Sequence, residues 1–280
     1  MLTSGPVLTA FLIGAIAAIT SGVIGVFSVL RTQSFAGHSL ADIATTGGAG
    51  AFLVAGLAAA TAMEAIGVQR RRGRDIATGV VLGGALGIAA LFLYLGTQHT
   101  SRTGASFSIL FGSIFVVAPD TVPAIIAAGV VAVATVAVLS RRLLLTAVAP
   151  ELARARGVSV RLTGIIFLAA LAVVVSLSAV AIGAVLSTAL LVGPAATALR
   201  VTRSPGKAVL VSAVTGLAAT WTGIALAYES YYWPPAGHGW PVSFFVVALV
   251  LVAYLLSYAR KPRRMPPRSP HEEAAECSPA

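Results

Sequence analysis

Long apolar segments constrain this chain more than any other feature. Residues 6–30 form such a segment, and comparable ones recur along the sequence. A helix that spans a bilayer needs about 20 apolar residues, and these segments lack the strict alternation expected of membrane β-strands. Only 10% of the residues are charged, against roughly a quarter in a typical soluble domain. The sequence therefore predicts an all-α, polytopic integral membrane protein.

The apolar segments lie between short basic loops, which allows the spans to be placed. After the first span at residues 6–30 we expect others at residues 76–95, 121–139, 162–199 (two spans, with Gly183 near the middle), 208–228 and 241–258. Residues 106–117 are too short to cross before Pro119 and are predicted to form a partial or re-entrant helix. Residues 38–68 would extend about 45 Å as one helix, too long for one upright span and too short for two. A break is expected there near Gly47, Gly48 and Gly50, and the total is eight to nine transmembrane helices.

The positive charges indicate the orientation of these spans. The net charge is +10, and the lysines and arginines gather in short loops and in the tail, as cytoplasmic segments do. Arg31 marks the cytoplasmic end of the first span, and residues 69–75 (QRRRGRD) form the strongest cytoplasmic loop. We expect the N-terminus outside, residues 1–259 in the membrane domain, and residues 260–280 as a disordered cytoplasmic tail. The charge is thus read as a marker of topology rather than of nucleic-acid binding.

His38 and Asp42 are the most informative polar pair in the sequence. Four residues apart on a helix, they lie one turn above each other on the same face. Ionisable residues inside apolar segments usually mark a pathway, so the pair is a candidate metal-transit site, with Glu64 as a weaker candidate near the cytoplasmic surface. An imidazole and a carboxylate accept Zn²⁺, Mn²⁺ and Fe²⁺ alike. The alternative is a mutually satisfied polar pair that only stabilises a helix contact.

Residues 150–161 (PELARARGVSVR) differ in composition from the rest of the membrane domain. They are polar and compatible with a short helix that ends at Gly157. Composition alone allows either a solvated cytoplasmic loop or a docking helix for a soluble partner. No GxxxxGK[ST] phosphate loop and no HExxH motif occur in the chain, so ATP binding by that loop and the usual zinc-protease signature are both excluded.

Five segments follow one another along the chain: GVFSVLRTQSFAGHSLADIATTG, ATGVVLGGALG, SILFGSIFVVAPDTV, PELARARGV and AIGAVLSTALLVGPAATA. In this order they resemble the permease subunits of bacterial ABC importers for zinc, manganese or iron. The resemblance covers nearly the whole chain apart from the tail. One departure concerns the first segment, where the acidic position of the family falls on His38 and its histidine position on Asp42. The exchange keeps one nitrogen and one oxygen ligand on the same face, so the resemblance still implies metal contact for both.

The resemblance also implies the partners of the chain. It implies a homodimeric permease in the bacterial cell membrane, joined by a cytoplasmic ABC ATPase and loaded by an extracytoplasmic metal-binding protein. No cofactor is held permanently, because the metal ion is cargo. The ATPase would dock on the helix that carries Pro150, Glu151, Arg154 and Gly157. Hydrolysis would take place on the ATPase, so the chain itself is not expected to be an enzyme.

Two rival functions remain open on the sequence. A permease for a metal chelate, such as a siderophore or haem, would need a wide lumen, which the small residues here allow. A secondary transporter could instead be driven by protons through Asp42 and Glu64. Uptake of free against chelated ion distinguishes the first rival, and sensitivity to an uncoupler distinguishes the second.

Overall fold

The computed structural model describes residues 5–31, 84, 87, 114, 119–233 and 239–259, and all regular structure among them is helical. Within these residues, five helices are long and apolar enough to cross a membrane. The predicted class, a polytopic bundle of apolar helices, is therefore confirmed for the described part. The spans predicted over residues 38–68 and 76–95 and the re-entrant segment at 106–117 lie outside the described residues, apart from three single positions.

Helices α1 (Gly5–Leu30) and α6 (Val122–Val148) begin within one residue of the starts of the predicted spans. Helix α1 matches the first span. Helix α6 follows a short 3-10 turn, η2 (Pro119–Thr121). The predicted end of this span at residue 139 is wrong, because α6 continues through Arg141 and Arg142 to Val148. Arginine and leucine are good helix formers and no breaker precedes Pro150, so the helix extends beyond its apolar part.

The long apolar stretch at residues 162–199, predicted as two spans, does fold as two helices, of which only the first is among the five that are long and apolar enough to cross a membrane. The two helices are α8 (Val160–Ile182) and α9 (Ala184–Val201), and Gly183 alone separates them. Gly183 has φ 95° and ψ 156°, a conformation that is essentially restricted to glycine. A residue with a Cβ atom would be strained in this conformation, so the glycine at position 183 determines where the helix breaks.

The last two predicted spans are also confirmed. Helix α10 (Pro205–Glu229) ends in a 3-10 turn, η3 (Ser230–Tyr232), and α11 (Val242–Ala259) returns along it. Aromatic side chains gather where the two helices meet this turn, and Trp240 packs near both Phe244 and Phe245. The Trp240 backbone N–H donates to the Ser230 hydroxyl at 2.9 Å, which fixes the return of the chain.

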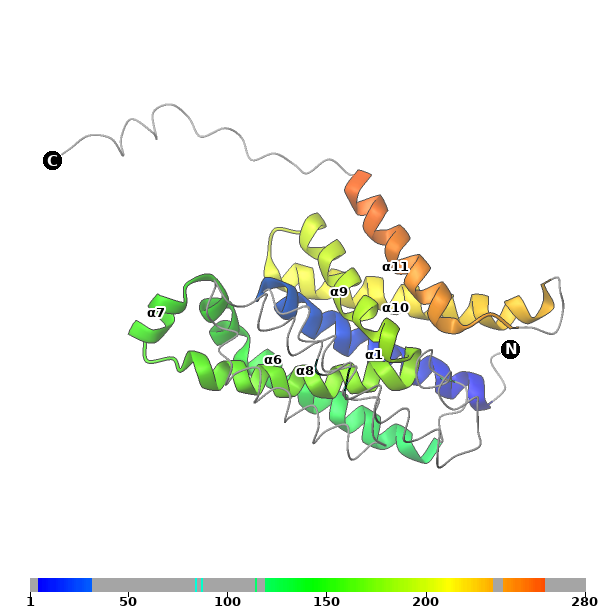
Figure 1. Ribbon diagram of the computed structural model, residues 1–280, viewed down its shortest axis with the longest axis horizontal. Coiled ribbons are helices and arrows are strands. Elements are labelled where there is room, and N and C mark those ends of the chain that lie inside the picture. Colours follow the sequence, from blue (N-terminus) through cyan, green and yellow to red (C-terminus); the bar gives the residue numbers. More distant parts are fainter. Residues whose placement is uncertain are drawn as a thin grey trace.

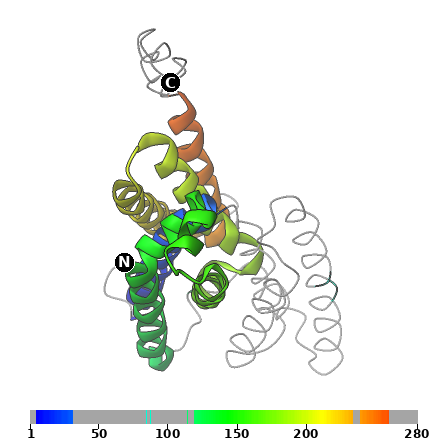
Figure 2. The ribbon, with the colours of Figure 1, turned by 90° about the vertical axis from the view of Figure 1, so that its left-hand side faces the viewer.

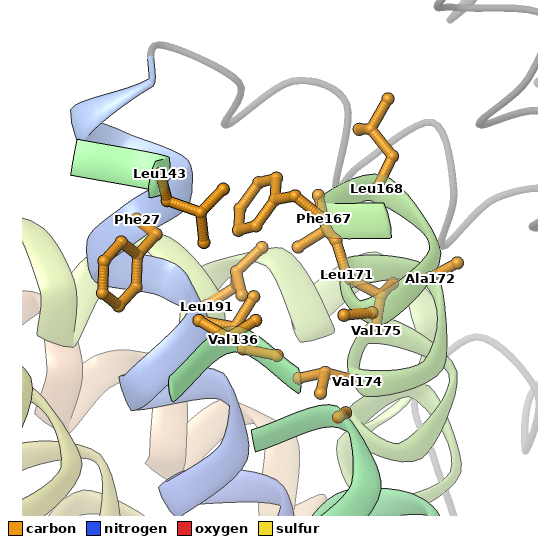
Figure 3. Packing of buried hydrophobic residues seen from close by; sticks show 13 residues of the cluster. Phe27, Val136, Leu143, Phe167, Leu168, Leu171, Ala172, Val174, Val175 and Leu191 are labelled. Carbon is orange, nitrogen blue, oxygen red and sulfur yellow. The ribbon is translucent and has the colours of Figure 1, made fainter. Parts of the chain in front are cut away.

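Helix α1 lies at the centre of the described bundle. Figure 1 shows α1, α6, α8 and α10 running in nearly the same direction, with α9 and α11 inclined to them. Helix α1 contacts α6, α8, α9 and α10. The largest buried cluster joins α1, α6, α8 and α9 through side chains such as Phe27, Leu143 and Phe167, and Figure 3 shows Leu143 and Phe167 pointing toward each other.

Small residues allow the backbone of α1 to approach its neighbours closely. A Cβ atom added at Gly22 would lie 2.7 Å from the Ala213 Cα of α10, and one added at Gly25 would overlap the Leu191 carbonyl oxygen of α9. Ser21 and Ser178 share a buried hydrogen bond of 2.6 Å between α1 and α8. Without a hydrophobic drive between helices in lipid, such close packing and polar contacts hold a bundle together. The small residues thus bring α1 into close contact with its neighbours.

The described charges are unequally distributed along the bundle. Every lysine and arginine among the described residues lies at the end that carries the C-termini of α1 and α6 and the short helix α7 (Pro150–Ala155). Figure 1 shows α7 at the opposite end of the bundle from the N-terminus, and Figure 2 views the molecule from the α7 end. The described structure therefore has one basic end.

Candidate functional site

The predicted metal residues His38, Asp42 and Glu64 lie outside the described residues. The same holds for all four histidines of the chain, including His99 and His238. In the part that the structure does describe, no group of three or more His, Cys, Asp or Glu side chains could hold a metal ion. The metal-transit site therefore stays a prediction from the sequence.

The predicted docking segment does fold as a short helix. Helix α7 starts with Pro150 in its first turn, where a missing N–H costs nothing, and Glu151 follows at the positive end of the helix dipole. Arg154 lies in the last turn, where a cation is favoured. Ala153 is fully buried and anchors the helix against the bundle. These local preferences explain why a polar segment of this length is ordered.

Gly157 ends α7 in the way that the sequence predicts. Its φ of 71° is left-handed, its N–H donates to the Arg154 carbonyl, and the Val158 N–H donates to the Ala153 carbonyl. These two bonds form a Schellman motif, which satisfies carbonyls that a helix end leaves free. Ser159 then caps α8 by accepting a hydrogen bond from the Leu162 N–H at 3.3 Å. The turn between α7 and α8 is thus closely specified by hydrogen bonds.

The outward side of α7 is available to a partner. Glu151, Arg154 and Arg156 are exposed, and Leu152 has 48% of its surface exposed. Only Ala149 lies between α6 and α7, and its N–H donates to the Leu145 carbonyl while its carbonyl accepts from the Ala153 N–H. A force applied to the exposed side of α7 would therefore reach the ends of both α6 and α8.

Where α1 and α6 end, the structure brings together three residues that the sequence did not connect. Arg31 is only 8% exposed, and its Nη1 donates to the Thr146 hydroxyl of α6 at 3.0 Å. The guanidinium carbon lies 5.4 Å from the centre of the Phe167 ring of α8, a cation–π distance. We call Arg31, Thr146 and Phe167 the Arg31 junction.

From the sequence we predict a different role for Arg31, that of a topology marker at the end of a span. The position at the basic end agrees with that role, but the burial does not follow from it. Thr146 and Phe167 carry no local signal, because each lies more than a hundred residues from Arg31 in the chain. A lone arginine next to a span, without the neighbouring basic residues seen in the other loops, was the one available hint.

Residues 5–260 match the model of a protein family described as the ABC 3 transport family. The chain belongs to the ABC 3 transport family. The match extends over the whole described bundle and over the predicted metal segment between α1 and α6. The resemblance that the five sequence segments indicate is thereby confirmed.

Relatives within the ABC 3 transport family have named transport roles. The chain is 28% identical over 232 residues to the manganese import system permease protein ScaB of Streptococcus parasanguinis, covering 79% of this chain and 80% of ScaB. It is also 28% identical over 206 residues to the high-affinity zinc uptake system membrane protein ZnuB of Haemophilus influenzae, covering 70% of this chain and 78% of ZnuB. Both matches cover most of each relative.

Solved structures share the fold of this family member. PsaBC from Streptococcus pneumoniae in complex with Fab superposes with a TM-score of 0.77 at 22% identity, over 93% of this chain and 94% of the other. An inward-facing conformation of a putative metal-chelate type ABC transporter superposes with a TM-score of 0.64 at 14% identity, over 91% and 85%. The arrangement of helices is therefore one already seen in ABC transporters.

Proposed function

We propose that this chain is the membrane-spanning permease subunit of an ATP-driven importer for a divalent transition-metal ion. Zinc and manganese are the first candidates and iron is the third. The family match over residues 5–260 carries the proposal, and relatives named for manganese import and zinc uptake support the class of cargo. The chain itself would transport, while ATP would be hydrolysed on separate subunits.

The proposed architecture has eight to nine transmembrane helices in the bacterial cell membrane. The N-terminus lies outside and the C-terminus in the cytoplasm. The gathering of every described lysine and arginine at the α7 end supports this orientation, because basic residues are enriched on the cytoplasmic side. The exposed apolar side chains of α6, α10 and α11 then face lipid.

His38 and Asp42 are proposed to take the ion on its way through the membrane. Two ligands hold a metal weakly, which suits a transit site that must release its cargo. Two copies of the permease would supply two such pairs. Glu64 would lie nearer the cytoplasmic exit. An extracytoplasmic metal-binding protein would deliver the ion to the vestibule.

Helix α7 is proposed as the docking site of the ABC ATPase. Its exposed polar side chains and the half-exposed Leu152 support this, since an interface requires both apolar contact and orienting charge. Nucleotide-driven movement of the ATPase would press on α7 and so on the ends of α6 and α8. Alternating access would follow from rigid-body shifts of these helices.

Uptake by the reconstituted complex tests the function. The chain, its ATPase and its binding protein are incorporated into liposomes, and ATP-dependent uptake of radiolabelled Mn²⁺ and Zn²⁺ is measured. We expect uptake that requires ATP and persists with an uncoupler. Uptake without nucleotide that collapses with an uncoupler would instead favour the proton-driven rival, and uptake of chelated ion alone would favour the chelate rival.

A double variant tests the transit site in the same liposomes. His38→Ala with Asp42→Ala should abolish metal uptake and metal-dependent ATP hydrolysis. Asp120→Ala is the matched control, because this carboxylate is exposed in η2, just before α6, and lies outside the proposed site. Unchanged uptake in the double variant would remove the pair from the mechanism.

A further inference from the structure

Arg31 differs from the other arginines at the basic end of the bundle. Arg141, Arg142 and Arg200 are exposed, as expected of side chains that reach water from the end of a span. By contrast, only 8% of the Arg31 surface is exposed. Taking a guanidinium out of water is costly unless fixed partners receive it. A residue that only marks topology would not need to be buried, so the burial of Arg31 points to a further role.

The partners of Arg31 are themselves held in place. The Thr146 hydroxyl donates to the Leu143 carbonyl at 3.0 Å, so its oxygen is oriented to accept from Arg31. Phe167 is fully buried in the largest apolar cluster. A planar guanidinium can donate in its plane and stack on a ring at the same time, which an ammonium cannot do. The junction thus fixes both the position and the orientation of the end of α1.

Both partners belong to the helices that flank α7. Thr146 lies in the last turn of α6, next to Ala149, whose carbonyl accepts the Ala153 N–H of α7. Phe167 lies in α8, whose start is tied to α7 by the Gly157 turn and the Ser159 cap. Any displacement of α7 therefore reaches Arg31 from two sides.

Helix α1 can carry such a displacement along its length. It is packed closely at Gly22 and Gly25 and joined to α8 by the hydrogen bond between Ser21 and Ser178. In the sequence, Arg31 also opens the stretch RTQSFAGHSLAD, which contains His38 and Asp42. The junction is therefore linked to α7 through α6 and α8, and in the sequence it directly precedes the segment that carries the predicted transit site.

We propose that Arg31 is a positioning residue that couples movement of α7 to α1 and so links ATP hydrolysis to passage of the ion. The proposal rests on the proposed function of the chain as an ATP-driven permease. Arg31 touches no cargo in this account. Its contacts with Thr146 and Phe167 make α1 follow α6 and α8 when the ATPase presses on α7.

The ratio of ions transported to ATP hydrolysed tests this coupling. In liposomes that contain the full complex, Arg31→Met should lower the ratio for radiolabelled Mn²⁺ or Zn²⁺ at least about fivefold, the lower end of typical allosteric coupling. ATP hydrolysis and co-purification of the ATPase should persist. Arg142→Met is the matched control, because this arginine is exposed on α6 at the same end, and its ratio should equal that of the wild type.

Milder variants keep the test decisive if Arg31→Met does not fold. Thr146→Val removes the hydroxyl at nearly constant volume, and Arg31→Lys retains the charge but cannot stack on Phe167 while donating in plane. Each variant should lower the same ratio by a smaller factor than Arg31→Met. Because both substitutions break the same contact, the double variant Thr146→Val with Arg31→Lys should lower the ratio by less than the product of the two single factors. Equal ratios in these variants and the wild type would overturn the proposal, as would a loss explained fully by the amount of assembled complex.

A second readout separates this proposal from the proposed cargo. Nitroxide labels at Leu8 on α1 and Val148 on α6, both exposed, are introduced into a Cys277→Ser background. In the wild type the distance between labels should stay constant when nucleotide is trapped in the complex, because the two helices move together. In Arg31→Met the distance should change. A constant distance in the variant overturns the coupling role, whereas a wild type that transports neither Mn²⁺ nor Zn²⁺ overturns only the proposed cargo.

Discussion

Replacing Gly22 by alanine should destabilise the bundle by forcing α1 and α10 apart. The new methyl group would lie 2.7 Å from the Cα and 2.8 Å from the N of Ala213, and both are backbone atoms that cannot rotate away. An ordinary contact between such atoms is about 3.5 Å, so the helices must separate locally by about 0.8 Å. Overpacking of this kind typically costs about 1–3 kcal/mol.

Two further glycines provide a graded comparison. An alanine Cβ at Gly206, in the first turn of α10, would meet nothing within 4 Å. At Gly14 it would meet only the ends of side chains, the Thr220 Cγ2 at 2.9 Å and the Ile224 Cδ1 at 3.0 Å. All three variants exchange a helical glycine for alanine, so the helix-propensity term of about 1 kcal/mol largely cancels in the comparison. We expect stability to fall in the order Gly206→Ala, Gly14→Ala, Gly22→Ala.

Thermal unfolding of the purified chain in detergent measures this order. Proteins of 150–250 residues shift by about 2–4 °C per kcal/mol, so Gly22→Ala should unfold about 2–12 °C below Gly206→Ala. The midpoint of Gly14→Ala should fall between them. If Gly22→Ala unfolds at or above the temperature of Gly206→Ala, the close approach of α1 and α10 is refuted.

Three other variants test separate features of the fold and of the docking helix. Gly183→Ala should lower the unfolding temperature through a strain of about 1–3 kcal/mol, because φ is 95° there; a midpoint at or above that of the wild type would contradict this. Ser159→Ala should cost about 1 kcal/mol through loss of the α8 cap, seen as a lower midpoint, whereas Ser159→Asp should retain it. Leu152→Glu should leave the midpoint unchanged, since the side chain is 48% exposed, but should reduce co-purification of the ATPase about tenfold. Full recovery of the ATPase with Leu152→Glu would remove this residue from the docking surface.

The helices whose starts and ends are determined by nearby residues could be predicted from the sequence. The apolar run before Arg31 predicts α1, and the Gly183 break and the Gly157 stop follow from the ability of glycine to adopt positive φ. The end of α6 was predicted wrongly because charge was taken to end the helix along with the span. Arginines end an apolar run without breaking hydrogen bonds, so the helix continues to Val148.

The contacts between distant residues could not be predicted in this way. Arg31 contacts Thr146 of α6 and Phe167 of α8, and no pattern within one helix signals a partner on another. The close approach at Gly22 likewise depends on Ala213 of α10. For the candidate site, helix α7 was predictable because its caps are local, and its role as a docking helix stays a prediction. The roles of His38 and Asp42 stay a prediction from their spacing and from the family resemblance.

The central place of α1 has a consequence for the biogenesis of the protein. This helix leaves the ribosome before α6, α8, α9 and α10, the described helices that pack against it. During synthesis the Ser21 hydroxyl cannot bond to Ser178 until α8 has been made. The guanidinium of Arg31 likewise cannot contact Thr146 and Phe167 until α6 and α8 have been made. Helix α1 is thus made before the described helices that surround it, so a chain that ends before α10 lacks part of the packing around α1.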